Sequence, residues 1–213
     1  MIKAFVWDLP TRLFHWTLVV LLGISVGTGL NGGLNAMDYH MLSGEAILAL
    51  IGFRIIWGLV GSRNARFASF IKGPAAIAAY LRSPRHEIGH NPLGALSVVA
   101  MLLCVAIQAV TGLFSTDDVF VDGPLRHLVS HETALRITNI HVLNLWVLGG
   151  LVGLHLGAIA WYQLKRGENL LMPMVTGWKH VTADTLPERN NRLLAVAVLA
   201  MVAGGVYYLV NYI

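Results

Sequence analysis

The most informative segment of this chain is TNIHVLNLWVLGGLVGLHLGAIAW, Thr138–Trp161. It is long and apolar enough to cross a bilayer as a helix, which takes about 20 mostly apolar residues. It also carries two histidines, His141 and His155, which are 14 residues apart. A helix turns by about 100° per residue, so both imidazoles are expected on one face, about 21 Å apart along the axis. A polar side chain at membrane depth is costly and usually marks a functional site.

The composition of the whole chain agrees with a membrane protein. Of its 213 residues 56% are apolar and 12% are charged, whereas a soluble domain carries about 25% charged residues. We therefore predict an all-α integral membrane protein: a four-helix transmembrane bundle over residues 1–180, then a linker and a fifth C-terminal transmembrane helix within residues 181–213. The other four apolar stretches are Leu13–Leu30, His40–Gly61, Gly94–Phe114 and Leu193–Tyr212.

The loop charges predict the orientation of these helices. The loops 62–92 and 163–192 carry five Lys and Arg each, whereas the loop 31–39 carries none and the loop 115–137 carries two. Positively charged loops stay on the inner side of the membrane. We therefore expect the N-terminus inside and, after five crossings, the C-terminus outside. The single cysteine, Cys104, excludes a disulfide framework and a covalently attached c-type haem, which needs C-x-x-C-H.

Two further histidines lie in predicted spans and complete two levels of imidazoles. His15 comes early in an outward helix and His40 opens an inward one, so depth pairs His15 with His155 on the inner side and His40 with His141 on the outer side. A bare transition metal would take three or four protein ligands. A haem iron takes four bonds from its own ring and needs only two axial ligands. The pattern therefore predicts two haems b, with these four histidines as the iron ligands.

The same spacing places neighbours beside the histidines. Gly29 lies fourteen residues after His15, at the outer level, and Gly44 lies one turn after His40, so both leave room for a broad flat group. Arg54 lies fourteen residues after His40, at the inner level, where its charge is expected to neutralise a haem propionate. His90 falls in an inner loop and is expected to be solvated.

Five motifs are informative together: VWD-PTR-FHW within residues 6–16, FRIIWGLVGSRNARF (Phe53–Phe67), HNPLGAL (His90–Leu96), QAVTGLF (Gln108–Phe114) and RGENLLMPMVTG (Arg166–Gly177). They resemble one known family, the bacterial cytochrome b561 / NiFe-hydrogenase b-type cytochromes, and the likeness runs almost to Lys179. The resemblance implies two haems b held by the four histidines, electron exchange between a membrane quinone and a redox partner, and a place in the bacterial inner membrane. Val142 follows His141 where the family pattern leads us to expect Glu.

Electron transfer is the activity we expect. The sequence shows no nucleophile–base pair, phosphate loop or buried carboxylate pair, and a bis-histidine haem has no open position for oxygen. The outer loops hold five acidic residues against two arginines, which would attract a cationic partner. The leading hypothesis is therefore oxidation of quinol in the membrane, with electrons passing to a periplasmic c-type cytochrome or other redox protein. That activity would be quinol:cytochrome oxidoreduction.

Three alternatives stay open. In the first, the chain is the membrane subunit of a hydrogenase or dehydrogenase that passes electrons to quinone. In the second it oxidises superoxide, although an acidic outer surface would repel that anion. In the third it is a histidine-lined metal or proton transporter. A transporter would need a polar path through the spans, and few residues provide one: Glu45, Gln108, Asn139 and Asn144.

Overall fold

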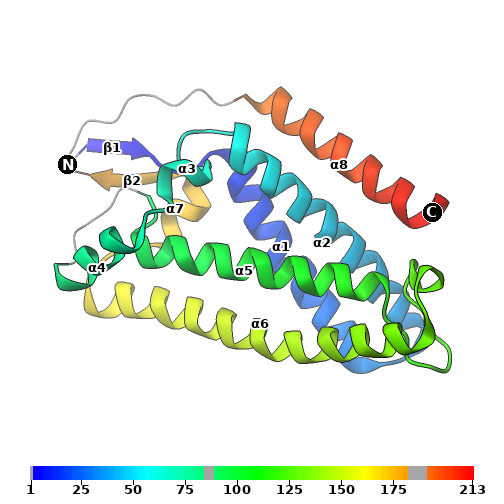
Figure 1. Cartoon of the computed structure of the whole chain (residues 1–213). Helices are drawn as coiled ribbons and strands as arrows, with labels where there is room; N and C mark the ends of the chain where they lie inside the picture. The colour runs from blue at the N-terminus through cyan, green and yellow to red at the C-terminus, as the bar shows by residue number, and fades with distance from the viewer. Residues whose placement is uncertain (1, 84–88, 182–190) are drawn as a thin grey trace.

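Five long helices make up most of the chain, as the computed structural model in Figure 1 shows. The structure describes residues 2–83, 89–181 and 191–213. All five helices are long and apolar enough to cross a membrane, so the prediction of an all-α, multi-pass membrane protein is confirmed. They are α1 (Leu9–Asn31), α2 (Leu34–Val60), α5 (Pro92–Leu113), α6 (His131–Lys165) and α8 (Arg192–Tyr212).

Short elements lie at the two ends of the bundle. One end, here called the sheet end, carries a two-stranded antiparallel sheet and three short helices: β1 (Ile2–Phe5), β2 (Trp178–Val181), α3 (Phe67–Phe70), α4 (Pro74–Arg82) and α7 (Leu171–Thr176). The other, the loop end, carries the turn at Gly32–Gly33 and residues 114–130, which include the 3-10 turn η1 (Arg126–Leu128). The C-terminus also lies at the loop end (Figure 1).

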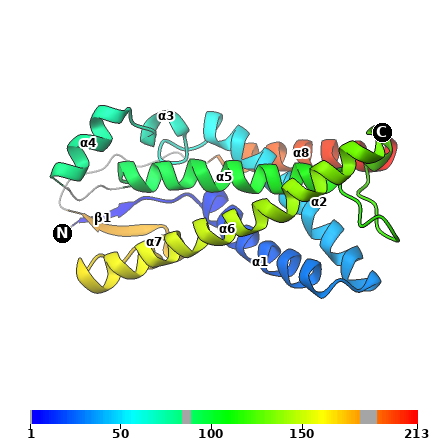
Figure 2. The same cartoon turned by 60° about the horizontal axis from the view of Figure 1, so that its bottom comes forward.

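The helices form two hairpins that are packed side by side. Helix α1 packs along α2, α5 packs along α6, and α2 joins the hairpins through α5. Within the described residues α1 and α6 have few backbone contacts with each other. The two hairpins, α1 with α2 and α5 with α6, can be followed in Figure 2. Helix α8 packs on the far side of α2, where Gly52 allows a close approach: a Cβ there would lie 2.6 Å from Cγ1 of Val202.

Several helices extend beyond the apolar stretches that predicted them. Helix α2 begins at Leu34 rather than His40, and α6 begins at His131 rather than Thr138. The hydroxyl of Ser130 accepts a hydrogen bond from the Thr133 amide and so caps α6. Exposed polar residues can continue a helix past the bilayer, where an apolar count no longer detects it. The predicted linker lies mostly outside the described residues.

The sheet end is joined by contacts between distant parts of the chain. Strand β1 pairs with β2 from Ile2↔Val181 to Phe5↔Trp178. The Asp8 side chain caps α1 by accepting a hydrogen bond from the Thr11 amide at 2.8 Å, and it accepts a second from Nε1 of Trp57 at 2.9 Å. Asp8 thereby fixes the start of α1 against the end of α2.

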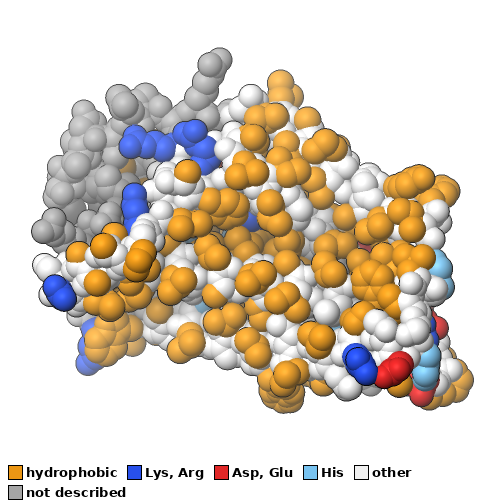
Figure 3. Space-filling view, viewed as in Figure 1, with side chains coloured by type: hydrophobic (Ala, Val, Ile, Leu, Met, Phe, Trp, Pro, Cys, Tyr) orange, Lys and Arg blue, Asp and Glu red, His pale blue; other side chains and the backbone are white. Residues whose placement is uncertain are grey.

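Apolar side chains cover the flanks of the bundle (Figure 3). Large residues on four helices are more than half exposed in the isolated chain, as a lipid-facing surface requires. Examples are Val20 at 60%, Leu103 at 61%, Leu154 at 72% and Leu193 at 84%. The buried core lies where α1, α2, α5, α6 and α8 meet, around Ile51, Trp57, Val105 and Leu148.

Candidate functional site

The four membrane histidines lie in two pairs, each of which crosses between the two hairpins. His15 on α1 faces His155 on α6, with ring centroids 6.5 Å apart and ring planes at 54°. His40 on α2 faces His141 on α6, with centroids 6.0 Å apart and planes at 84°. The first pair lies toward the sheet end and the second toward the loop end. These are the same partners that the spacing of the histidines indicates.

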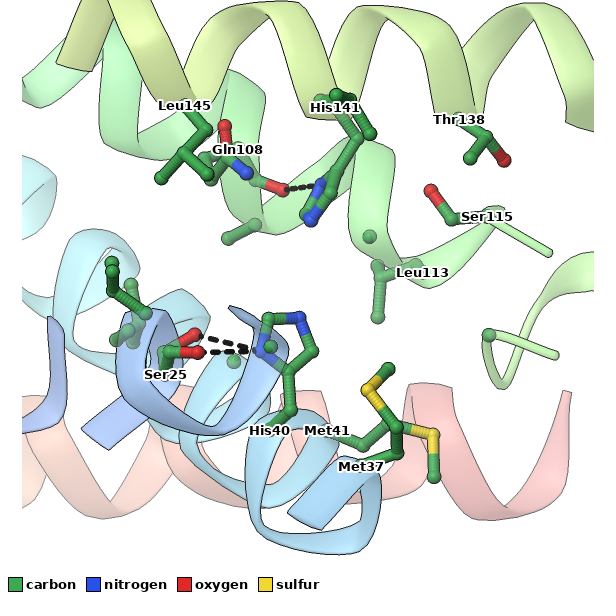
Figure 4. Close-up of a pocket in the computed structure, with 18 of the residues that line it drawn as sticks. Ser25, Met37, His40, Met41, Gln108, Leu113, Ser115, Thr138, His141 and Leu145 are labelled. Atoms are coloured by element: carbon green, nitrogen blue, oxygen red, sulfur yellow. Dashed lines mark hydrogen bonds between the residues drawn. The ribbon is translucent and has the colours of Figure 1, made fainter. Parts of the chain in front are cut away.

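The loop-end pair is oriented by backbone carbonyl groups. Nδ1 of His40 lies 2.8 Å from the Ser25 carbonyl oxygen, and Nδ1 of His141 lies 3.0 Å from the Gln108 carbonyl oxygen. A carbonyl oxygen only accepts, so in both rings Nδ1–H is the donor. The proton-free Nε2 atoms are then available as metal ligands. Figure 4 shows the two rings turned toward each other, with these contacts as dashed lines.

The separation of the rings within each pair matches two axial ligands on one metal. An imidazole nitrogen lies about 2 Å from a metal that it binds and about 1 Å from its own ring centre, so two opposed imidazoles have centroids about 6 Å apart. The observed separations are 6.0 and 6.5 Å. No cluster of three or more His, Cys, Asp or Glu side chains that could hold a bare metal ion occurs in residues 2–83, 89–181 and 191–213. Two protein ligands at each level therefore favour a metal whose other ligands come from a bound group.

A cavity of about 340 Å³ surrounds the loop-end pair, and most of its lining is apolar (Figure 4). This lies in the range of pockets that hold small-molecule cofactors. Gly29 and Gly44 both line it. A Cβ on Gly29 would lie 2.8 Å from Cε1 and Nδ1 of His40, so this glycine makes room for the imidazole itself. A Cβ on Gly44 would meet no atom within 4 Å, so Gly44 leaves open space beside the ring.

The sheet-end pair lies among polar atoms that lack partners. Nδ1 of His15 is buried without a hydrogen bond, as is Nη1 of Arg54. Arg54 is only 3% exposed, and its guanidinium carbon lies 4.8 Å from the centre of the Phe67 ring. Leaving a buried donor unpaired costs roughly 1–3 kcal/mol, and more when it is charged. A group with oxygen acceptors at this level would satisfy both donors.

His90 differs from its predicted position. The sequence placed it in a solvated loop, but its ring packs between Trp7 and Phe70, with centroids 4.6 and 4.7 Å away. Its Nδ1 is sealed from solvent without a hydrogen-bond partner. Burial, together with the nearby charges of Arg54 and His155, lowers the pKa of His90 to about 4. His90 is therefore neutral at pH 7, and no periodic pattern of residues would have predicted its burial.

Contacts between α5 and α6 support the loop-end site. The Thr111 hydroxyl lies 3.1 Å from Nδ1 of His141, and a Cβ on Gly112 would lie 3.2 Å from Cε1 of the same ring. Asn144 donates to the Gln108 side chain at 2.7 Å and to the Cys104 carbonyl at 2.9 Å. These contacts hold α5 against α6 and so fix the height of His141.

A family model describes most of the chain. The model of the prokaryotic cytochrome b561 family matches residues 6–177, which include all four helices of the two hairpins and both histidine pairs. The chain belongs to the prokaryotic cytochrome b561 family. The match ends before α8, which begins at Arg192.

Curated relatives of this cytochrome b561 chain are hydrogenase subunits by name. It is 22% identical to the probable Ni/Fe-hydrogenase 1 B-type cytochrome subunit of Escherichia coli K12, over 84% of this chain and 91% of that protein. It is 26% identical to the probable Ni/Fe-hydrogenase B-type cytochrome subunit of Azotobacter vinelandii, over 85% of this chain and 90% of the relative. No solved structure matches the chain.

Membership of the cytochrome b561 family implies a b-type haem, and the residues present fit that group. The separation of the paired rings suits axial ligation. At the loop end both Nδ1–H groups are held by carbonyl oxygens, and an apolar cavity lies between the rings. At the sheet end a buried guanidinium has a free donor for an anionic substituent. The chain is thus a membrane b-type cytochrome.

Proposed function

We propose that the chain carries electrons across the membrane between the quinone pool and a redox protein that docks at the loop end. His40 and His141 would hold one haem b, and His15 and His155 a second. The observation that carries the proposal is the pair of facing imidazoles at each of two levels, 6.0 and 6.5 Å apart. A b-type haem with two histidine ligands supplies reversible one-electron storage with no open position for oxygen.

The protein's own residues provide the positions for this transfer. Helix α6 holds one ligand of each pair, about 21 Å apart along its axis, so it spaces the two redox sites across the apolar layer. The carbonyls of Ser25 and Gln108 fix the loop-end ligands. The apolar lining of the cavity keeps water from the site, which limits side reactions.

Charge distribution supports the sheet end as the cytoplasmic side. On the face seen in Figure 3, most of the Lys and Arg side chains lie near the sheet end, and acidic side chains lie at the loop end. Of the cations in the loops 62–92 and 163–192, the described residues at the sheet end are Arg63, Arg66, Lys72 and Arg82 in or beside α3 and α4, and Lys165, Arg166 and Lys179 at the end of α6 or in β2. By the positive-inside rule we propose that the sheet end faces the cytoplasm of a bacterial inner membrane and that the C-terminus is periplasmic. Reporter fusions at the C-terminus test this orientation.

The relatives favour a hydrogenase-type partner at the loop end. They are named as B-type cytochrome subunits of Ni/Fe-hydrogenases, and such a subunit would receive electrons at the periplasmic side and deliver them to quinone. The match covers at least 84% of this chain and 90% of each of those two proteins. We therefore favour inward electron flow from a periplasmic redox enzyme over the outward flow that the sequence alone suggested.

A soluble c-type cytochrome is the second candidate partner, and the acidic loop end supports it. The loops 31–39 and 115–137 together hold five acidic residues and two arginines. Part of this charge is used internally, because Glu132 pairs with Arg136 and Asp118 lies 3.5 Å from Nε2 of His131. The acidic surface available to a basic partner is therefore smaller than the count suggests.

A reduced-minus-oxidised visible spectrum with a pyridine haemochrome count tests the proposal. Two haems b per chain support it, whereas a folded protein without haem would leave the histidine-lined transporter as the better explanation. Direction is tested next, in vesicles that contain quinone. Hydrogenase-type inward flow predicts quinone reduction by a low-potential donor added at the loop end. Rapid reduction of a basic c-type cytochrome by menaquinol would support outward flow instead.

A further inference from the structure

The sheet end holds a cluster of buried polar atoms without partners that the two ligand pairs do not explain. In the part of the chain that the structure describes, seven buried side-chain atoms lack a hydrogen bond, and six of them belong to this end. The six are Oγ1 of Thr11, Nε of Arg12, Nδ1 of His15, Nη1 of Arg54, Oγ of Ser62 and Nδ1 of His90. Buried polar groups in native proteins are nearly always paired, so these atoms indicate a polar ligand.

Arg54 is the most constrained member of the cluster. It is only 3% exposed in the isolated chain and lies against the Phe67 ring. The charge of the Asp8 carboxylate acts on it, but both Asp8 oxygens already accept hydrogen bonds, from the Thr11 amide and from Trp57. The guanidinium therefore has a donor, Nη1, that finds no acceptor among the residues that the structure describes.

His90 supplies a second donor beside the arginine. The Arg54 guanidinium lies over the Phe67 ring, Phe67 contacts Phe70 at 5.8 Å between ring centroids, and Phe70 contacts His90 at 4.7 Å. His90 and Arg54 therefore belong to one buried cluster, and the charge of Arg54 acts on the His90 imidazole. Tilted contacts with the Trp7 and Phe70 rings, at interplanar angles of 57° and 45°, hold the His90 ring in place. A neutral imidazole has one N–H to give. A guanidinium and an imidazole that share one buried site suit an anion with two oxygens.

We propose that Arg54 and His90 together bind one carboxylate, and that this carboxylate is a propionate of the haem at the sheet end. The inference rests on the proposed function, since it requires a haem between His15 and His155. It goes beyond the arginine alone, because it assigns His90 as a second anchor. It also explains why an imidazole lies buried in a loop at the start of α5. Both residues are positioning residues and neither touches the iron.

The test measures how fast the haem leaves each site, using haem and haem dimethyl ester, which lacks ionised propionates. The variants are Arg54→Gln, which removes the charge, and His90→Phe, which keeps a ring between Trp7 and Phe70. Arg63→Gln is the matched control, because Arg63 is an exposed cation at the same end. A haem-scavenging globin takes up released haem. EPR distinguishes the two sites, since the signal of a ferric bis-imidazole haem depends on the angle between the ligand planes, 54° and 84° here.

With ordinary haem, Arg54→Gln is expected to release the sheet-end haem about tenfold faster, as for loss of a charged hydrogen bond. His90→Phe has a smaller effect of the same kind, the double variant is not additive because both residues share one ligand, and Arg63→Gln changes nothing. With the dimethyl ester the difference disappears, because the wild type loses its advantage over Arg54→Gln. The loop-end haem is unaffected throughout.

Three results would overturn the inference while leaving the proposed function intact. Equal losses from both haem sites would show that the two residues act only on the fold. The same effect of Arg54→Gln with haem and with its ester would show that the arginine does not bind a propionate. The third result comes from adding acetate. If acetate slows the loss of the sheet-end haem equally in protein loaded with the ester and in protein loaded with ordinary haem, the site binds a free carboxylate. Protein that binds no haem at all would instead refute the proposed function.

Discussion

The two histidine pairs are close in ring separation and differ in what holds them. At the loop end, Nδ1 of His40 and of His141 each donates to a backbone carbonyl, so the fold itself orients the ligands. At the sheet end, Nδ1 of His15 is buried without a partner, and its ring packs edge-on against Trp16 at 5.0 Å. One site is therefore arranged by the backbone, and the other by aromatic packing and charge.

This difference has consequences for any metal bound at each level. An imidazole that donates through Nδ1–H becomes a stronger electron donor through Nε2, which stabilises an oxidised metal. A buried cation such as Arg54 stabilises the reduced, more negative state, because charges interact strongly in a medium of low dielectric constant. The two ends should therefore differ in ligand rigidity and in reduction potential.

Removing a ligand at either end is expected to have the largest effect. His141→Ala should lose the loop-end haem and His155→Ala the sheet-end haem, each lowering the haem count from two to one per chain. The pyridine haemochrome assay measures the count, and EPR shows which signal has gone. Loss of both haems from a protein that keeps its helical circular dichroism would contradict independent pairing by level.

Gly29→Ala tests the tighter of the two ends. A methyl group there would lie 2.8 Å from the His40 ring, so the imidazole must move away from the Ser25 carbonyl. Changes to groups that orient a ligand weaken metal binding by about 10- to 100-fold, and we expect that range for the loop-end haem only. Gly27→Ala is the control, because a Cβ on Gly27 of the same helix meets nothing within 4 Å. Equal haem release from both variants would rule out a steric role for Gly29.

The contrast between the ends also shows what a sequence can predict. The separation of His141 and His155 is a local property of one helix, so counting residues suffices to place both on one face. Their pairing by membrane depth with His15 and His40 requires only the order in which the helices cross the membrane. The five helices were predictable for the same reason, since an apolar stretch of about 20 residues is a local signal.

The carbonyl partners and the sheet-end cluster were not predictable, because they depend on contacts between distant segments. The Ser25 carbonyl meets His40 only after the α1–α2 hairpin closes, and a backbone carbonyl leaves no mark in the sequence. His90 looked like a loop residue because its partners, Trp7 and Phe70, come from other segments. The strand pair β1–β2 joins residues 2–5 to residues 178–181 and has no helical period to reveal it.

The surroundings of the two histidine pairs are expected to set the order of the two reduction potentials. The sheet-end haem should titrate at the higher potential, because Arg54 lies near it and the His15 ring has no donor bond to strengthen it. We expect at least a tenfold preference for the electron at the sheet end, which corresponds to about 59 mV for a one-electron couple. A redox titration followed by visible spectroscopy measures both potentials, and His155→Ala identifies which belongs to the sheet end. If His155→Ala removes the lower-potential component, the assignment of charge effects is wrong.

Thr111→Val makes the smallest change that still probes the loop end. The valine keeps the shape of the side chain but removes the oxygen 3.1 Å from Nδ1 of His141. That hydroxyl already donates to the backbone at Ile107 and Gln108, so toward His141 it acts as a second acceptor. Its loss leaves the Gln108 carbonyl in place and makes the imidazole a slightly weaker electron donor. The loop-end potential should therefore rise by less than the gap between the two haems, and the sheet-end potential, as the internal control, should stay constant. A fall in the loop-end potential would mean that the Thr111 hydroxyl donates to His141, and the tautomer inferred from the carbonyl contact would then be wrong.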